Sequence, residues 1–148
     1  MAWMTKDNKI ITSKEDFPEN CFGFVYRIDN LTNGKSYIGK KQCFSHRKKK
    51  FGKRKIAAMT DKRAKKYEIV IKETDWKDYI GSSEELIKDI KNGDRINKTI
   101  LEFAFSKYHL TYLEVKHQFI HEVLESEKWY NSNILSKFFP SIFNFKDK

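Results

Sequence analysis

The chain has 148 residues, a length at which one hydrophobic core and one domain are expected. Hydrophobic residues make up 39% of it and aromatic residues 15%, which excludes wholesale disorder. The formal net charge is +10, no apolar run approaches the roughly 18 to 20 residues of a membrane span, and the N-terminus lacks the apolar stretch of a signal peptide. We therefore expect a cytoplasmic protein without a membrane partner, with free thiols at Cys21 and Cys43.

The positive charge is concentrated in one segment. Between Lys40 and Lys66 there are 13 lysines and arginines against one acid, Asp61, so this segment carries +12 and the remainder −2. A block of like charge repels itself unless it meets a polyanion, which favours a nucleic-acid backbone as its partner. The alternative is a solvated, flexible loop, and an anionic membrane surface ranks third because the segment has no repeated apolar face.

The first part of the chain predicts a β-hairpin after a lead-in. Residues 1 to 20 are interpreted as a polar lead-in with a short extended piece near residues 9 to 12, and residues 21 to 148 as the single domain. Residues 22 to 39 contain two runs rich in aromatic and branched side chains, separated by the turn signal Asn33-Gly34. We expect these two runs to pair as antiparallel strands.

The remaining elements predict an α+β fold. The apolar run 67 to 72 is too short to decide between strand and helix, and residues 76 to 81 predict a bend. Ser82-Ser83 predicts the cap of a helix that ends at Asn92-Gly93, residues 97 to 106 alternate like a strand, and residues 110 to 124 have helical periodicity. The apolar tail 134 to 145 is expected to close over the core. The result is a small antiparallel sheet of three or more strands flanked by helices.

Each strand of the predicted hairpin carries a tyrosine, and the spacing between these two tyrosines is informative. Ten residues separate Tyr26, the last residue of Phe24-Val25-Tyr26, from Tyr37, the first of Tyr37-Ile38-Gly39. Here the chain resembles the GIY-YIG nuclease superfamily, and most closely phage-borne homing endonucleases of the Seg-like kind. Phe24 and Val25 stand where the family name has Gly and Ile. The resemblance extends over residues 22 to 134.

The resemblance implies the site residues. It implies catalytic roles for Tyr26 and Tyr37, for Arg47 eight residues beyond Gly39, and for Glu114 on the later helix as the ligand of one Mg²⁺ or Mn²⁺ ion. It also implies a role for Asn131, which follows Tyr130 after that helix. Residues 79 to 81 repeat the Tyr-Ile-Gly tripeptide and are interpreted as a loop and helix cap, without a second site.

The chemistry of phosphodiester hydrolysis is consistent with these residue types. A water must become nucleophilic, and charge on the phosphoryl oxygens must be neutralised. Tyr26 could accept the water proton only if Lys40, Lys41 and a metal lower its pKa, while Arg47 offers a planar fork to a phosphate oxygen. His46 is an alternative base or relay. The expected DNA-contacting residues are Lys40, Arg47, Lys48, Lys49, Lys50, Lys53, Arg54, Lys55 and Asn131.

The predicted function is metal-dependent endonucleolytic cleavage of DNA. Its rival is a noncatalytic basic nucleic-acid-binding protein on the same scaffold, because the first motif lacks its Gly and fold does not guarantee chemistry. Strand tyrosines often serve only in cross-strand packing, and Arg47 could be a plain phosphate contact. The chain leaves little room for a separate DNA-reading domain, so low specificity or a homodimer is expected. If the protein is phage-encoded, it would act in the host cytoplasm.

Overall fold

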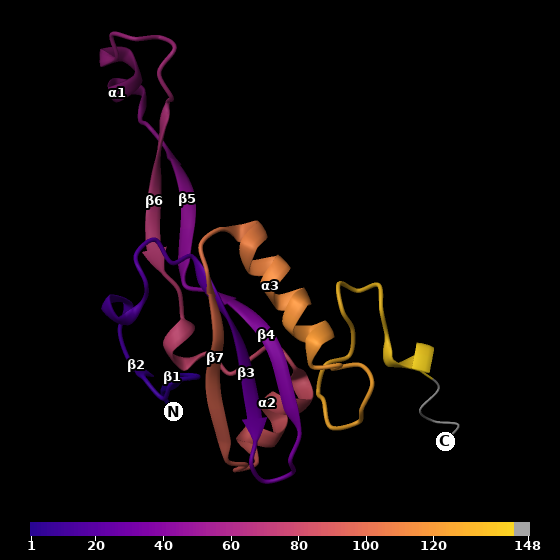
Figure 1. The fold of residues 1–148 in the computed structure, drawn as a ribbon. Coiled ribbons are helices and arrows are strands. Elements are labelled where there is room, and N and C mark those ends of the chain that lie inside the picture. The colour runs from indigo at the N-terminus through magenta and orange to yellow at the C-terminus, as the bar shows by residue number, and fades with distance from the viewer. Residues whose placement is uncertain (144–148) are drawn as a thin grey trace.

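The computed structural model describes residues 1 to 143, which form a mixed five-stranded sheet with helices on both faces (Figure 1). The strand order is β2-β1-β7-β3-β4. The central hairpin of β3 (Gly23–Asn30) and β4 (Ser36–Gln42) is antiparallel, and β7 (Ile96–Ala104) pairs antiparallel with the other side of β3. The predicted hairpin, the third strand and the α+β class are therefore confirmed, and β4 is the edge strand of the sheet, where Ser36 forms a parallel bridge with Trp129.

The N-terminal segment is part of the sheet and is more than the polar lead-in that the sequence predicts. β1 (Trp3–Thr5) pairs parallel with β7, and β2 (Ile10–Ile11) pairs antiparallel with β1. Trp3 is fully buried and its Nε1 donates a hydrogen bond to the Trp76 carbonyl at 2.7 Å. β2 falls within the short extended piece expected near residues 9 to 12, whereas the three residues of β1 are too few to show an alternating pattern, so only its tertiary pairing reveals it.

Each face of the sheet carries its own cluster of buried side chains. On one face α3 (Lys107–Ile120) packs against Val25 and Ile38 through Leu110 and Leu113. The other face buries a larger aromatic cluster beneath α2 (Glu84–Lys91) and the 3₁₀ turns η1 (Lys14–Asp16) and η2 (Trp76–Asp78). The members of that cluster include Trp3, Phe24, Tyr26, Ile28, Trp76 and Leu86.

Local capping sets where the two long helices begin. The Ser83 side chain accepts a hydrogen bond from the Leu86 backbone N–H, which confirms the predicted start of α2. Ser106 caps α3 in the same way by accepting from the His109 N–H. Because of this cap, α3 begins three residues earlier than the periodicity predicts, and it ends four residues earlier, at Ile120.

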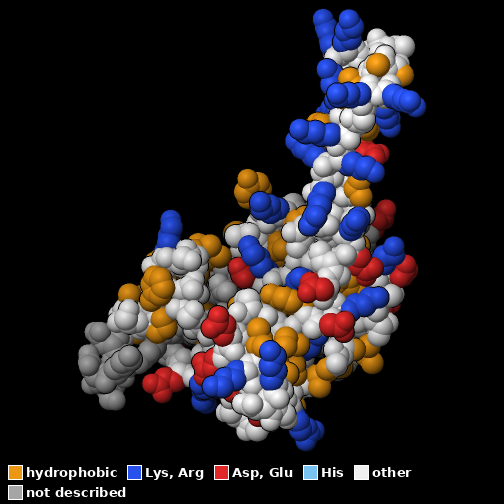
Figure 2. All heavy atoms as spheres, turned by 180° about the vertical axis from the view of Figure 1, so that it is seen from behind, with side chains coloured by type: hydrophobic (Ala, Val, Ile, Leu, Met, Phe, Trp, Pro, Cys, Tyr) orange, Lys and Arg blue, Asp and Glu red, His pale blue; other side chains and the backbone are white. Residues whose placement is uncertain are grey.

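The basic segment forms a projecting arm in place of the flexible loop considered from the sequence. β5 (Phe44–Lys50) and β6 (Tyr67–Glu73) pair as a two-stranded antiparallel ribbon, and α1 (Lys53–Ala58) lies at its tip. We call residues 44 to 73 the arm. It continues directly from β4 and stands away from the body (Figures 1 and 2). The undecided apolar run 67 to 72 is a strand because it pairs with β5.

The C-terminal tail covers the core less than predicted. Ile134 is buried and Phe143 packs against the α3 cluster, but the other apolar side chains are exposed. They are Leu135, Phe138, Phe139 and Ile142, next to and within the turn η3 (Pro140–Phe143). The predicted contribution of Phe145 lies outside the described residues.

Two further expectations concern the whole chain. Cys21 and Cys43 are buried free thiols, as expected. Within residues 1 to 143, no helix has the length and apolar character needed to traverse a lipid bilayer.

Candidate active site

A polar cleft of about 890 Å³ opens beside β4, the edge strand of the sheet. Its walls come from four parts of the chain: β4, α3, the N-terminal turn of α2 and the segment 130 to 136. The residues that line it and enter the argument are Tyr37, Lys40, Ser82, Thr111, Glu114, Gln118, Tyr130 and Asn131. We call this space the cleft.

Three tyrosines gather beneath the cleft. The Tyr26 ring centroid lies 6.1 Å from that of Tyr37 and 5.9 Å from that of Tyr79. Tyr26 is fully buried, and this burial, helped by Tyr37 and Tyr79, raises its pKa well above the ordinary value of 10. The raised pKa favours the protonated form of the Tyr26 hydroxyl. The shift opposes the role of proton acceptor expected for it.

Two glycines permit this tyrosine packing. Gly39 faces Tyr26 across the β3–β4 ladder, and a Cβ on Gly39 would lie 2.5 Å from the Tyr26 hydroxyl oxygen. Gly81 has φ +92°, and a Cβ there would lie 3.4 Å from the same oxygen. The last residue of each Tyr-Ile-Gly tripeptide is thus a point where the backbone passes close to the Tyr26 side chain.

Tyr37, Lys40 and Glu114 supply the polar groups of the cleft. The Tyr37 hydroxyl and the Ser82 hydroxyl are hydrogen-bonded at 2.8 Å. Burial raises the pKa of Glu114 above its ordinary range, while the nearby Lys40 opposes the shift. Burial also raises the pKa of Tyr37, and the Glu114 carboxylate adds to this. The Lys40 ammonium donates to the Thr111 hydroxyl at 3.0 Å, which places a cation on the α3 wall.

Lys41 fastens the loop that follows the arm. Its ammonium group lies 2.5 Å from an Asp75 carboxylate oxygen and 4.2 Å from the centroid of the Tyr79 ring. The same loop leads to Ser82 at the cleft. Lys41 therefore holds the wall of the cleft in place beside the buried tyrosines.

Asn131 and Gln118 hold the strand that carries Tyr37. The Asn131 side chain accepts from the Ile38 N–H at 3.1 Å and donates to the Ile38 carbonyl at 2.8 Å, so it pairs with the edge of β4 as a neighbouring strand would. Gln118 donates to the same carbonyl at 3.2 Å. Both polar ends of Asn131 are thus used inside the protein, and its predicted DNA contact stays a prediction.

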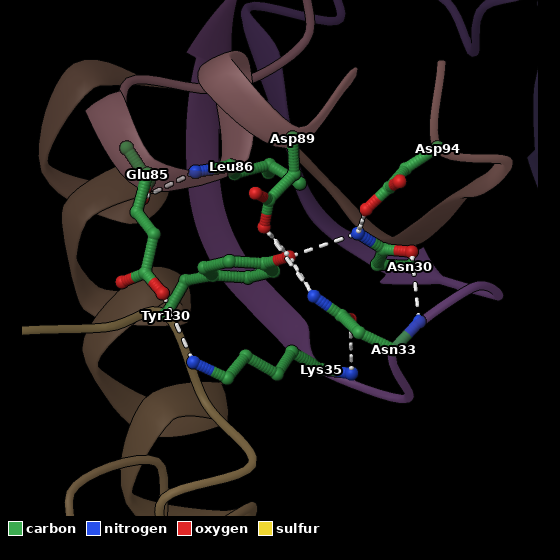
Figure 3. Close-up of polar contacts among 9 residues, drawn as sticks. Asn30, Asn33, Lys35, Glu85, Leu86, Asp89, Asp94 and Tyr130 are labelled. Carbon is green, nitrogen blue, oxygen red and sulfur yellow. Dashed lines mark hydrogen bonds and ion pairs between the residues drawn. The ribbon is translucent and has the colours of Figure 1, made fainter. Parts of the chain in front are cut away.

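Tyr130 ties the segment beside the cleft to the hairpin and to α2 (Figure 3). Its hydroxyl donates to Asp89 at 2.7 Å and accepts from Asn30 and from Asn33, each at 2.9 Å. Lys35 pairs with Glu85 at 2.9 Å across the same region. This network joins three of the segments that surround the cleft, and it fixes their relative positions.

Comparison with protein families gives a match over residues 3 to 134 to the model described as "Putative endonuclease segE, GIY-YIG domain". The chain belongs to the GIY-YIG endonuclease family. The comparison with curated proteins and that with solved structures each gave no match. The matched range covers all four segments that line the cleft, the last of them up to Ile134. It begins at Trp3, the first residue of β1.

The fold brings together some of the predicted site residues of this GIY-YIG endonuclease and separates others. Tyr37, Lys40 and Glu114 line the cleft, and Tyr26 and Lys41 lie beside it. The structure does not bring Arg47 and His46 there. Arg47 is exposed on the arm opposite Val70, and the His46 ring packs on Phe22 at 5.6 Å between centroids. The remaining basic residues of the prediction lie on the arm: Lys48, Lys49, Lys50, Lys53, Arg54 and Lys55.

Sequence reasoning missed the contribution of residues 79 to 82. The repeated Tyr-Ile-Gly was interpreted only as a loop and cap, and Ser83 does cap α2. The loop is also a wall of the site, because Tyr79 and Gly81 contact Tyr26 and Ser82 binds the Tyr37 hydroxyl. The repetition of the family tripeptide was the signal that could have revealed this role.

The donor set of the cleft fits one hard divalent cation. Within the described residues, no three His, Cys, Asp or Glu side chains cluster as a complete metal cage. The half-buried Glu114 carboxylate offers one anionic ligand in a cleft wide enough for water and phosphate. Mg²⁺ is commonly held in this way, by one or two carboxylates with waters and substrate phosphates filling the octahedron.

Proposed function

We propose that this GIY-YIG endonuclease hydrolyses phosphodiester bonds of DNA in the cleft with one divalent cation, Mg²⁺ or Mn²⁺, held by Glu114. The observation that carries the proposal is the meeting of Glu114, Lys40 and the Tyr37 hydroxyl in one open polar cleft. A homing role in a phage, which the family resemblance implies, belongs to the same proposal.

The chain's own residues have separable tasks in this reaction. A cation bound at Glu114 would neutralise phosphoryl oxygens and lower the pKa of a water beside it. Lys40 places a further positive charge at the phosphate, and the Tyr37 hydroxyl, aligned by Ser82, can donate to an oxygen of the reacting group. Tyr26 keeps its proton and positions the tyrosine cluster. Asn131 and Gln118 hold β4 in place while negative charge develops on the phosphoryl oxygens.

The noncatalytic alternative rests on the missing first Gly, and the structure weakens that argument. Phe24, at the position of the Gly, points into the aromatic core, where its ring centroid lies 4.9 Å from that of Trp3. It is fully buried and does not line the cleft. The departure from the family motif therefore changes the core and leaves the cleft open.

Plasmid cleavage tests the proposal. Wild-type protein should convert supercoiled DNA to nicked or linear DNA with Mg²⁺ and not with excess chelator. Glu114→Gln should abolish cleavage while DNA binding is kept or becomes tighter, because the metal ligand and one negative charge are removed together. A protein that shifts the DNA band in a gel but never relaxes the plasmid would support the noncatalytic rival. Wild-type cleavage by Glu114→Gln would overturn the metal assignment.

A further inference from the structure

The arm has the charge of a nucleic-acid-binding element and no core of its own. Its 30 residues hold twelve lysines and arginines against three acids, a net charge of +9, which leaves +1 for the other 118 residues. None of its residues from 45 to 73 is buried. Two-stranded ribbons of this kind are marginally stable in water. Residues 45 to 73 are thus a charged surface that no other described part of the chain buries, and Figure 2 shows the blue side chains crowding over it.

One face of the arm has the composition of a surface that contacts bases. Residues that face one another across an antiparallel ladder share a face of the ribbon. The inner face, as we call it, therefore contains His46, Lys48 and Lys50 of β5 with Tyr67, Ile69 and Ile71 of β6. Ile69 and Ile71 are 57% and 59% exposed, and across the ladder they face Lys48 and His46. The Lys48 ammonium lies 4.6 Å from the centroid of the Tyr67 ring.

The inner face continues into a groove at the base of the arm. His46 and Ile71 also line this groove of about 550 Å³, together with Phe22, Phe44 and Phe105 of the base and body. The two surfaces therefore meet at a concave corner between the arm and the domain. The charged residues of the groove are Lys14, Glu15 and Glu19, so the groove adds a concave, largely apolar surface, and the positive charge that attracts a polyanion comes from the arm.

We propose that the arm enters the major groove of duplex DNA as a two-stranded ribbon, with the inner face toward the base edges. The choice of DNA as partner rests on the proposed function. The B-form major groove is about 12 Å wide and admits a two-stranded ribbon, whereas the minor groove, about 6 Å wide, must be widened by bending the duplex before it takes strands. β5 has seven residues, so the ribbon is about 23 Å long and spans about two thirds of a turn of the duplex.

The chemistry of the inner face matches what the major groove displays. Lysine donates hydrogen bonds to guanine O6 and N7, and aliphatic side chains contact the methyl group of thymine. These are the polar and apolar halves of the inner face. The cations at the tip, beyond the ribbon, suit phosphates, which carry affinity without sequence information. We therefore expect the tip to supply most of the affinity and the inner face to supply the sequence preference.

Paired variants on a binding-competent background test the proposal. Glu114→Gln serves as the background, so that binding is measured without cleavage. Into it are placed Ile69→Asn with Ile71→Asn on the arm, or Ile10→Asn with Leu31→Asn as the control. The control residues are equally exposed, at 56% and 53%, and lie outside both arm and cleft. Each protein is offered a random duplex library, and the affinities for selected and scrambled duplexes are then measured at several salt concentrations. Circular dichroism checks that each variant is folded.

We expect the control pair to keep the sequence preference of the background. The arm pair should lose that preference at least tenfold, with an unchanged salt dependence because no charge is removed. Methylation of guanine N7, a major-groove atom, should interfere with binding of the Glu114→Gln background alone, which requires no arm variant. Netropsin, which occupies the minor groove, should not compete.

The opposite results overturn the proposal. An arm pair that retains its preference, or binding that netropsin blocks and N7 methylation leaves intact, would place the reading surface elsewhere. Preferential binding of double-stranded RNA would do so too, since the A-form major groove is too deep and narrow for side chains to read. If the wild-type protein failed to cleave plasmid DNA, the proposed function would be overturned instead of the binding mode of the arm. The two failures are therefore distinguishable.

Discussion

At Gly39 the lack of a side chain makes room for the buried tyrosine of the site. A Cβ would lie 2.5 Å from the Tyr26 hydroxyl oxygen and 2.8 Å from Cζ, and Tyr26 is fully buried with no space to retreat. We expect Gly39→Ala to lower the free energy of unfolding by about 1 to 3 kcal/mol, the usual cost of overpacking a core. It should also slow cleavage, because Tyr37 is displaced.

Urea denaturation and single-turnover cleavage measure the two effects. Gly52→Ala is the matched control, since Gly52 has an ordinary φ of −66° and no atom within 4 Å of an added Cβ. The control should keep wild-type stability. If Gly39→Ala also kept the wild-type free energy of unfolding, the close approach of β4 to Tyr26 would not explain why this position needs a glycine.

Lys98 is a buried cation outside the site. Only 3% of it is exposed, its ammonium donates to the Lys77 carbonyl at 3.2 Å, and it lies 4.2 Å from the Trp3 ring centroid. Burial lowers the pKa of Lys98 to about 8, against the smaller opposing effect of Asp78. The folded state therefore binds fewer protons than the unfolded state between pH 8 and the ordinary lysine pKa, about 10.4.

This shift has a defined sign in stability. Below pH 8 the buried charge costs stability, and the cost falls as pH rises from 8 toward 10.4. Lys98→Met should therefore raise the free energy of unfolding at pH 7 by about 1 to 3 kcal/mol, and its advantage should shrink at pH 9.5. Urea denaturation at both pH values is the measurement, with the exposed Lys91→Met as control. An advantage that does not change with pH would mean that Lys98 is uncharged or solvated at neutral pH.

At the scale of elements, β4 and β5 follow one another in the chain but serve different parts of the molecule. β4 places Lys41 against Asp75 and Tyr79 beside the cleft, whereas β5 carries Arg47 outward on the arm. We expect Arg47→Lys to keep the single-turnover rate within about threefold of wild type at saturating protein. Lys41→Met should lower that rate about tenfold, the equivalent of about 1.4 kcal/mol, because the wall that carries Ser82 loses its anchor.

Saturating protein removes differences in affinity from this comparison. A large fall in rate for Arg47→Lys together with a wild-type rate for Lys41→Met would restore Arg47 as the phosphate clamp that the motif spacing predicts. It would also require the arm to fold back over the cleft when DNA binds.

The elements that the sequence predicted are those with local signals. The hairpin has its Asn33-Gly34 turn, and α2 has its Ser83 cap. β1 has no such signal and forms because β7 offers it a partner, whereas β2, which pairs with β1, falls within the extended piece expected near residues 9 to 12. The sequence did not predict the arm for a related reason. Its two strands pair across 16 intervening residues, and they show little apolar alternation.

The candidate site was predictable where the motif spacing is regular. Tyr26, Tyr37 and Glu114 follow from the spacing of the family motifs, and the fold brings them to the cleft or beside it. Tyr79 and Ser82 enter the site from a loop that follows the arm. The repeated Tyr-Ile-Gly of residues 79 to 81 is the sequence signal for their role, and only the fold shows that this loop returns to β4. The raised pKa of Tyr26 is likewise a property of its burial, which becomes visible only when the surrounding elements are in place.

At the scale of the whole molecule, charge and chemistry are divided between two bodies. The arm carries +9 of the net +10, while the domain that contains the cleft is close to neutral. A near-neutral domain gains little from long-range attraction to DNA, so most of the counterion release on binding should come from the arm. Substitutions on the arm should therefore change the affinity for DNA, and substitutions in the cleft should change the cleavage rate.

Neutralising the arm tests this division. Changing Lys48, Lys49, Lys50 and Lys53 together to Gln should make the slope of log K against log salt shallower by about 0.9 for each DNA phosphate that the protein no longer neutralises. The rate at saturating protein should stay near wild type, because none of the four lines the cleft. As a control, the exposed Lys9, Lys88, Lys91 and Lys137 of the body are changed to Gln, which removes the same charge. If the two fourfold variants had equal salt slopes, net charge alone would govern binding, and the arm would be no more than a solvated ribbon.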